Sequence, residues 1–85
     1  MGELYKLPNI GKKIEEQLNA VGITNYEELK ALGSRAAWLH IQSIDSSACI
    51  NRLMALEGAI QGVNKTELSP EIKAELKSFY NAHKL

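Results

Sequence analysis

The stretch CINRLMALEGAIQG, at residues 49–62, decides the fold that we predict for this chain of 85 residues. Its larger apolar residues are spaced as one broad stripe along an α-helix: Cys49, Ile50, Leu53, Met54, Leu56 and Ile60. A helix that is apolar over so much of its circumference is contacted on several sides. We therefore expect this helix to be central, with Cys49 buried as a small hydrophobic residue and Gly62 ending the helix.

The residues before this stretch predict three further helices. The first has its apolar face at Ile10, Ile14, Leu18 and Val21, and Gly22 follows as a left-handed cap. Thr24 and Glu27 have the spacing of a capping box, which predicts a second helix that buries Tyr26, Leu29 and Leu32 and ends at Gly33. Ser34 is a cap candidate for a third helix, with Ala37, Ile41 and Ile44 inward and Trp38 and Leu39 at its flanks.

The residues after the central stretch predict one more helix. Ser69-Pro70-Glu71 combines a cap, a proline at the first helical position and an acid near the positive end of the helix dipole. No stretch alternates apolar and polar residues for long enough to form a strand. The sequence therefore predicts one domain over residues 1–85: a compact all-α bundle of about five helices, of helix-hairpin-helix or SAM-domain-like architecture. We expect five leucines inside it: Leu18, Leu29, Leu53, Leu56 and Leu76.

Composition limits the functions that this domain can have. Lys and Arg number 10, and so do Asp and Glu, so no strong basic field attracts nucleic acid. No apolar run approaches the ~20 residues that cross a bilayer, and the first residues lack a signal-peptide pattern. One cysteine cannot form an internal disulfide, which favours a reducing cytoplasm. We therefore expect a cytoplasmic domain without membrane contact, whose binding to nucleic acid is local and weak or depends on a second protein.

The stretch LPNIGKKI, at residues 7–14, has the composition of a sharp turn that enters a helix. Pro8 stops a preceding helix, Gly11 permits unusual dihedral angles, and Asn9 is a common choice for a left-handed residue. A helix entered in this way has unpaired N–H groups at its start, together with the positive end of the helix dipole. Such a start is a potential phosphate site, to which Lys12 and Lys13 in the first turn add charge.

This stretch resembles a helix-hairpin-helix motif, in which hairpin amides bind a DNA backbone phosphate without reading sequence. The sequence departs from that pattern at Asn9, which replaces a glycine, and at Glu15, which with Glu16 puts negative charge near the site. A shift of 22 residues aligns Leu7, Ile10, Gly11 and Lys13 with Leu29, Leu32, Gly33 and Arg35. The residues predicted to contact DNA backbone are Asn9, Ile10, Gly11, Lys12, Lys13 and, through this internal repeat, Arg35.

A wider set of landmarks is similar to the C-terminal domain of the TfoX/Sxy competence regulators. The set includes residues 7–11, 21–23, 28–33, 51–59 and 68–76, and the resemblance covers the chain from about Leu4 to His83. The run Ala55-Leu56-Glu57-Gly58-Ala59, in order with the hairpin, carries most of the specificity. The resemblance implies a helical fold and a bacterial regulatory context, with the domain present here without the N-terminal α/β domain that usually precedes it.

Two functional hypotheses remain open at this point. One is a regulatory module that touches duplex DNA through the hairpin, and the other is a protein-interaction module in which the hairpin is only a structural corner. An enzyme has no supporting motif, since neither Cys49 nor Glu57 has a catalytic partner at a suitable spacing. His40 and His83 lack neighbours at metal-ligand spacing, so we expect no metal, no cofactor and no small-molecule substrate. Glu57 is expected to bind a basic residue or a helix N-terminus.

Overall fold

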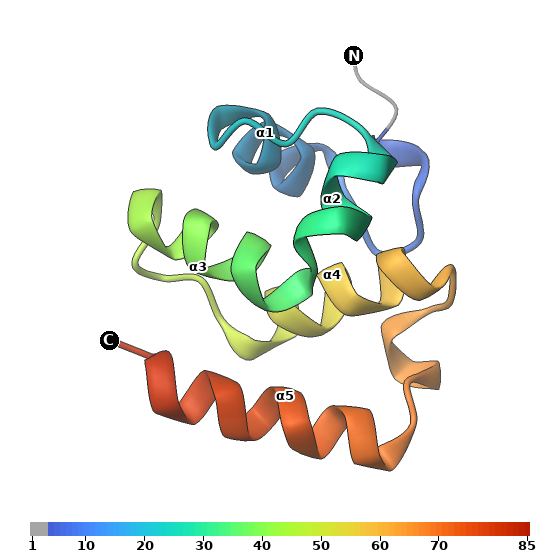
Figure 1. Ribbon diagram of the computed structural model, residues 1–85, viewed down its shortest axis with the longest axis vertical. Helices are drawn as coiled ribbons and strands as arrows, with labels where there is room; N and C mark the ends of the chain where they lie inside the picture. The colour runs from blue at the N-terminus through green and yellow to red at the C-terminus, as the bar shows by residue number, and fades with distance from the viewer. Residues whose placement is uncertain (1–3) are drawn as a thin grey trace.

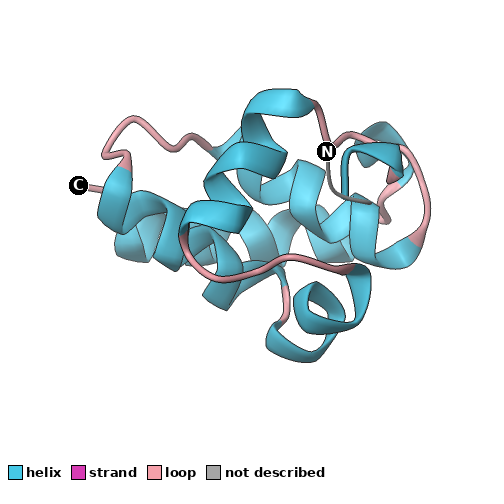
Figure 2. Ribbon diagram, turned by 90° about the horizontal axis from the view of Figure 1, so that it is seen from above, coloured by secondary structure: helices cyan, strands magenta, loops and turns pink. Residues whose placement is uncertain are grey.

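A computed structural model describes residues 4–85 of the chain. Its elements, in chain order, are the 3-10 turn η1 (Leu4–Lys6), α1 (Lys12–Ala20), α2 (Tyr26–Leu32), α3 (Ser34–Ile44), α4 (Ile50–Gln61), the 3-10 turn η2 (Lys65–Glu67) and α5 (Pro70–His83). The described residues thus form five α-helices and no strand. Figure 2 shows these helices joined by loops and turns. The predicted all-α fold is confirmed.

Helix α4 is the central element of this bundle. It packs against α2, α3, α5 and η2, and in Figure 1 α5 lies along the lower side of the molecule with α4 above it. The five leucines that we expected inside are fully buried: Leu18, Leu29, Leu53, Leu56 and Leu76. The broad apolar stripe of α4 is thus matched by neighbours on several sides, which is why its sequence decides the fold.

The start of α2 differs by one residue from the predicted capping box. Asn25 is the N-cap, and its side chain accepts a hydrogen bond of 2.8 Å from the Glu28 amide. Glu28 Oε1 in turn accepts from the amide of Thr24 at 2.8 Å and from its hydroxyl at 2.9 Å. These hydrogen bonds lower the pKa of Glu28, those from Thr24 most strongly. The prediction of Thr24 and Glu27 as the box was wrong because Asn25 is an equally good cap one residue later.

Three other helix ends can be compared with the sequence. Gly62 ends α4 in the left-handed conformation, at a φ of 76°, and the Ser69 side chain caps α5 by accepting from the Ile72 amide at 3.2 Å. Both predictions are confirmed. Ser34, in contrast, is the first residue of α3 and not its cap, because Gly33 holds the N-cap position. The Ser34 hydroxyl is thereby free to bond elsewhere in the fold.

Burial differs from the prediction at Trp38 and at Cys49. Trp38 is fully buried instead of lying at a flank, with its ring edge-on to Phe79 and Tyr80 of α5. Its Nε1 donates to the carbonyl of Cys49 at 3.1 Å. Cys49 is exposed because it is the N-cap of α4 and its side chain lies outside the helical stripe.

Two apolar residues predicted inside are exposed at helix ends. Leu32 is the last residue of α2 and is 40% exposed, and Ile44 is the last residue of α3 and is 53% exposed. Their spacing matches the buried faces of their helices, but the chain turns away after each of them, so no following turn covers their side chains. The spacing of apolar residues in a helix predicts which face is buried, but it does not predict how far along that face neighbouring elements pack.

Candidate functional site

The hairpin at residues 7–11 joins η1 to α1 through a tight turn. The amide of Leu7 donates to the carbonyl of Leu4 at 2.9 Å, and the amide of Ile10 donates to the carbonyl of Leu7 at 3.2 Å. Asn9 has a φ of 68°, and it is the one non-glycine residue with a positive φ in the described part of the chain. The prediction that Asn9 adopts the left-handed conformation is confirmed.

The Asn9 side chain anchors this turn to the end of α4. Its Nδ2 donates to the carbonyl of Val63 at 3.0 Å and to that of Ala55 at 3.5 Å, and its Oδ1 accepts from the Lys65 amide at 3.0 Å. Both donor positions of the amide are therefore occupied inside the molecule. Asn9 fixes where the hairpin lies, and its side chain has no donor left for a ligand.

Gly58 makes this anchor possible. A Cβ built on Gly58 would lie 2.5 Å from Asn9 Nδ2 and 2.8 Å from the Val63 carbonyl oxygen, which are shorter than any real Cβ contact. The absence of a side chain at Gly58 thus lets the hairpin approach α4 closely. Sequence reasoning missed that Asn9 is the approaching group, although both residues stood out separately.

The start of α1 lies on the outer side of the anchored turn. Lys12 is the first residue of α1, Gly11 is its N-cap in an extended conformation, and no side chain caps the helix. Residues 11–13 are exposed, and no group within residues 4–85 accepts a hydrogen bond from their amides. The nearby Ile10 is 5% exposed and belongs to the core, so it holds the turn from beneath.

Packing within the described chain does not explain why residue 11 is a glycine. Its φ of −90° is open to any residue, so the unusual dihedral angles expected for it are absent. A Cβ added at Gly11 would meet no atom within 4 Å. A glycine without an internal reason, next to three unbonded amides, leaves the backbone accessible to a group from outside.

Two acids lie in the same part of α1, and they differ in environment. Glu15 is 3% exposed, and its Oε2 accepts a hydrogen bond from the Tyr5 amide of η1 at 3.2 Å. Glu16 is exposed. Of the two acids expected near the hairpin, Glu15 is therefore buried, and its hydrogen bond also ties η1 to the first turn of α1.

Arg35, the last of the predicted contact residues, lies at the start of α3. Its Nη2 is 3.3 Å from Oε1 of Glu75 in α5, in an exposed ion pair. The Ser34 hydroxyl donates to Glu57 Oε1 at 2.6 Å, and the second Glu57 oxygen accepts from Gln61 at 2.6 Å. Glu57 thus bonds to two neutral side chains, and not to the basic residue or the amides of a helix N-terminus that were expected. The structure brings Lys12 and Lys13 together at α1, while Arg35 is held toward α5.

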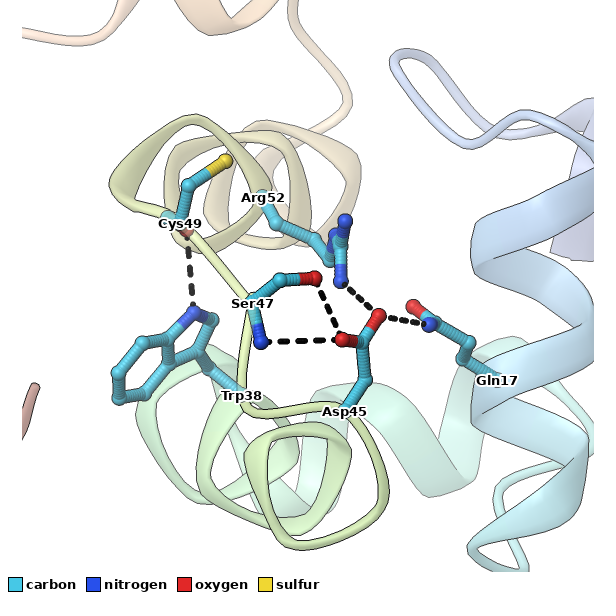
Figure 3. Close-up of polar contacts among 6 residues, drawn as sticks. All are labelled: Gln17, Trp38, Asp45, Ser47, Cys49 and Arg52. Carbon is cyan, nitrogen blue, oxygen red and sulfur yellow. Dashed lines mark hydrogen bonds and ion pairs between the residues drawn. The ribbon is translucent and has the colours of Figure 1, made fainter. Parts of the chain in front are cut away.

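Asp45 forms a polar junction that the sequence did not reveal. Asp45 directly follows α3, and Figure 3 shows its carboxylate between side chains of α1 and α4: Oδ2 accepts from Gln17 at 2.8 Å and from Arg52 at 3.0 Å. Oδ1 accepts from the amide and the hydroxyl of Ser47. The bonds from Ser47, and then those from Gln17 and Arg52, hold the pKa of Asp45 well below its usual range. The only signal in the sequence was an acid and two serines that break the helical pattern.

An open groove of about 450 Å³ lies at the opposite end of α1 from the hairpin. Its lining is mainly apolar and comes from the end of α1, from α2 and from α3: Val21, Gly22, Ile23, Glu28, Ala31, Leu32 and His40. In the described part of the chain, no group of three or more His, Cys, Asp or Glu residues is placed to hold a metal ion. None of the described helices is long and apolar enough to cross a membrane.

Five α-helices, with α4 at the centre, form an all-α bundle in the described part of the chain. The hairpin is anchored on α4, and α1 and α3 each start after a glycine N-cap. Residues 1–80 match the family described as the TfoX C-terminal domain. The chain belongs to this family, and the resemblance seen in the sequence is confirmed.

Individual relatives support the same assignment. Protein Sxy of Escherichia coli (strain K12) is 34% identical over 73 residues, which cover 86% of this chain and 35% of Sxy. The chain thus spans about a third of the length of that curated relative. An uncharacterized protein from Listeria monocytogenes, in a triclinic crystal form, matches with a TM-score of 0.92 and 47% identity over 93% of this chain and 90% of that one. The structure of a Listeria monocytogenes protein of unknown function, in a tetragonal crystal form, matches with a TM-score of 0.89 and 46% identity. This match covers 92% of this chain and 96% of that one.

Proposed function

We propose that this domain is a non-catalytic regulatory binding module, related to the control of bacterial competence, that contacts the backbone of duplex DNA through the start of α1. The observation that carries the proposal is the exposed helix start at residues 11–13, whose amides have no acceptor within residues 4–85. Unpaired amides and the positive end of the helix dipole favour an anion, and phosphate is the common one.

Three features of the hairpin support this reading. Lys12 and Lys13 are exposed in the first turn and add positive charge. Gly11 has no packing reason to be a glycine, and its missing side chain leaves room for a phosphate to reach the amides. Asn9 holds the turn rigidly on α4, so the amides are positioned before any ligand arrives.

The charge of the chain sets the expected strength. With 10 basic and 10 acidic residues, the domain lacks the general field that gives strong salt-dependent binding. The contact is therefore weak and backbone-directed, with little sequence preference, since phosphates carry no base information. Useful affinity in a cell then comes from a partner protein that binds DNA alongside this domain.

The test is a titration of isotope-labelled protein with duplex DNA at low and at physiological salt, followed by amide chemical shifts. The expected result is shifts around residues 9–13 at low salt that a Lys12→Ala/Lys13→Ala variant loses. Each lysine removed should lower the slope of log affinity against log salt by about one. Lys77→Ala/Lys84→Ala, which removes two exposed lysines of the C-terminal region, is the matched control and should bind like the wild type. Absence of shifts in the wild type, or equal loss in both variants, would refute DNA contact at the hairpin.

A protein-interaction module is the second candidate, and the open groove supports it. Leu32 is 40% exposed there beside the buried Ile23, so apolar surface is available to a partner. In this alternative the hairpin is only a structural corner, and Lys12→Ala/Lys13→Ala has no effect on function. A Leu32→Ser variant separates the two, because it removes apolar surface from the groove and leaves the start of α1 unchanged.

A further inference from the structure

The buried carboxylate of Glu15 lies one helical turn after Gly11. The amide of Glu15 donates to the Gly11 carbonyl at 3.0 Å, so the two residues are stacked along the axis of α1. Helical side chains tilt toward the N-terminus of their helix. The Glu15 side chain follows this direction and reaches the Tyr5 amide in η1. The carboxylate therefore lies on the side of α1 that faces η1, within one helical turn of the residues whose amides would receive a phosphate.

No cation is paired with this carboxylate in the described part of the chain. The ion pairs within residues 4–85 are Arg35–Glu75 and Arg52–Asp45, and neither includes Glu15. A buried charge is screened by salt much less than an exposed one, and its effect on a neighbouring charge is larger because the local dielectric constant is lower. A negative charge at Glu15 therefore opposes a phosphate at the same place where Lys12 and Lys13 attract it.

We propose that Glu15 limits the affinity of the α1 start for phosphate while it positions η1 against α1. This inference rests on the proposed function, because it concerns the strength of the same site. The hydrogen bond to Tyr5 gives the side chain a reason to be buried there, and the charge that comes with it lowers anion affinity.

The test compares Glu15→Gln with Glu16→Gln. A glutamine at position 15 still offers an oxygen to the Tyr5 amide and removes the charge, so duplex DNA should bind on the order of fivefold more tightly at low salt. Glu16→Gln removes the same charge from an exposed neighbour and should change affinity by less than about twofold. As salt is added within the range where binding is still measured, the gain at position 15 should shrink less than any gain at position 16, because a buried charge is screened less than an exposed one.

Exchange of the Tyr5 amide reports on the geometry independently of DNA. It should be protected from exchange in the wild type and in Glu15→Gln, and it should lose protection in Glu15→Ala. If Glu15→Gln does not fold, Glu15→Met, which is neutral and of similar length, takes its place with the same expected gain in affinity.

The outcomes separate this inference from the proposed function. If wild-type amides 11–13 respond to DNA and Glu15→Gln binds no more tightly, or Glu16→Gln gains equally, Glu15 does not limit affinity and the proposed function stands. If neither the wild type nor Glu15→Gln responds while Tyr5 stays protected, both are wrong. A response in Glu15→Gln alone supports the role of Glu15 and refutes DNA contact by the wild-type hairpin.

Discussion

The starts of α1 and α3 are built alike and are surrounded differently. Each follows a glycine N-cap without a side-chain cap, Gly11 in one case and Gly33 in the other, as the internal repeat of 22 residues aligned them. At α3 the chain supplies carboxylates of its own, because Glu57 accepts from Ser34 and Glu75 pairs with Arg35. Neither the amides of residues 34–36 nor those of residues 11–13 find an acceptor within residues 4–85. Residues 11–13 are exposed, however, whereas Ser34 is buried and Arg35 and Ala36 are half-buried. A helix start is therefore a candidate ligand site only where its amides are exposed and its side chains are not already paired.

The two helix starts are also anchored to α4 in different ways. The largest loss of stability is expected from a substitution that disrupts the anchor of α1. Gly58→Ala places a methyl group against Asn9 Nδ2 and the Val63 carbonyl, where backbone and turn must shift. Such overpacking should lower the free energy of unfolding by about 1–3 kcal/mol. Chemical denaturation measures the loss, and amide exchange should increase at residues 9–13 more than at residues 34–36. Equal exchange at both starts would show that Asn9 does not anchor the hairpin separately.

Glu57→Ala acts on the other start. It leaves the Ser34 hydroxyl, in a residue that is 2% exposed, without its acceptor. A buried polar group left unpaired costs about 1–2 kcal/mol, so denaturation should detect a loss of that size. Exchange should rise at residues 34–36 and stay unchanged at 11–13. Glu75→Ala, which removes an exposed ion pair, is the control and should cost less than about 1 kcal/mol.

Asp45 links α1 to α4, and its lowered pKa leads us to expect that stability depends on pH. Its pKa is lower in the folded chain than in the unfolded one, so its stabilising contribution is fully present above pH ~4, the ordinary range of an aspartate. That contribution decreases as the pH falls toward the lower pKa of the folded state. Thermal unfolding of the wild type and of Asp45→Asn should therefore differ at pH 7 and converge at acidic pH. A constant difference at all pH values would mean that the Asp45 charge is not what the junction uses.

The smallest expected effect on stability comes from Gly11→Ser. The backbone at Gly11 is extended and accepts a serine, whose side chain is a better N-cap, so stability should increase by a few tenths of a kcal/mol, about 0.3. The serine oxygen would accept from the amides of the first turn and compete with phosphate. DNA binding should thus become weaker while the fold becomes more stable. Weaker binding together with lower stability would indicate that the substitution distorts the hairpin, and not that the serine side chain caps the first-turn amides.

Most of the fold could be predicted from the sequence, because helical spacing and caps are local. The stripe of α4, the cap at Ser69 and the left-handed Asn9 all rest on residues a few positions apart. Errors arose where two local solutions were equivalent, as for Thr24 and Asn25, or where burial depends on a distant element. Trp38 is covered by α5, some 40 residues later, which no local pattern reveals.

The candidate site was predictable in part for the same reason. The turn at Asn9 and the exposed lysines follow from local rules, but the partners of Asn9 lie 46–56 residues away. The burial of Glu15 and the hydrogen bond between Glu57 and Ser34 likewise depend on packing between elements. The internal repeat correctly aligned two helix starts and gave no information about which one is exposed.

The central claim is that the start of α1 receives a phosphate and the start of α3 does not. The most direct measurement is one titration of the wild-type protein with duplex DNA at low salt, in which the amides of residues 11–13 and 34–36 are followed in the same spectra. We predict progressive shifts at 11–13 that disappear as salt is added, and no shifts at 34–36. Equal shifts at both starts, shifts at α3 alone, or no shifts at either would contradict the account.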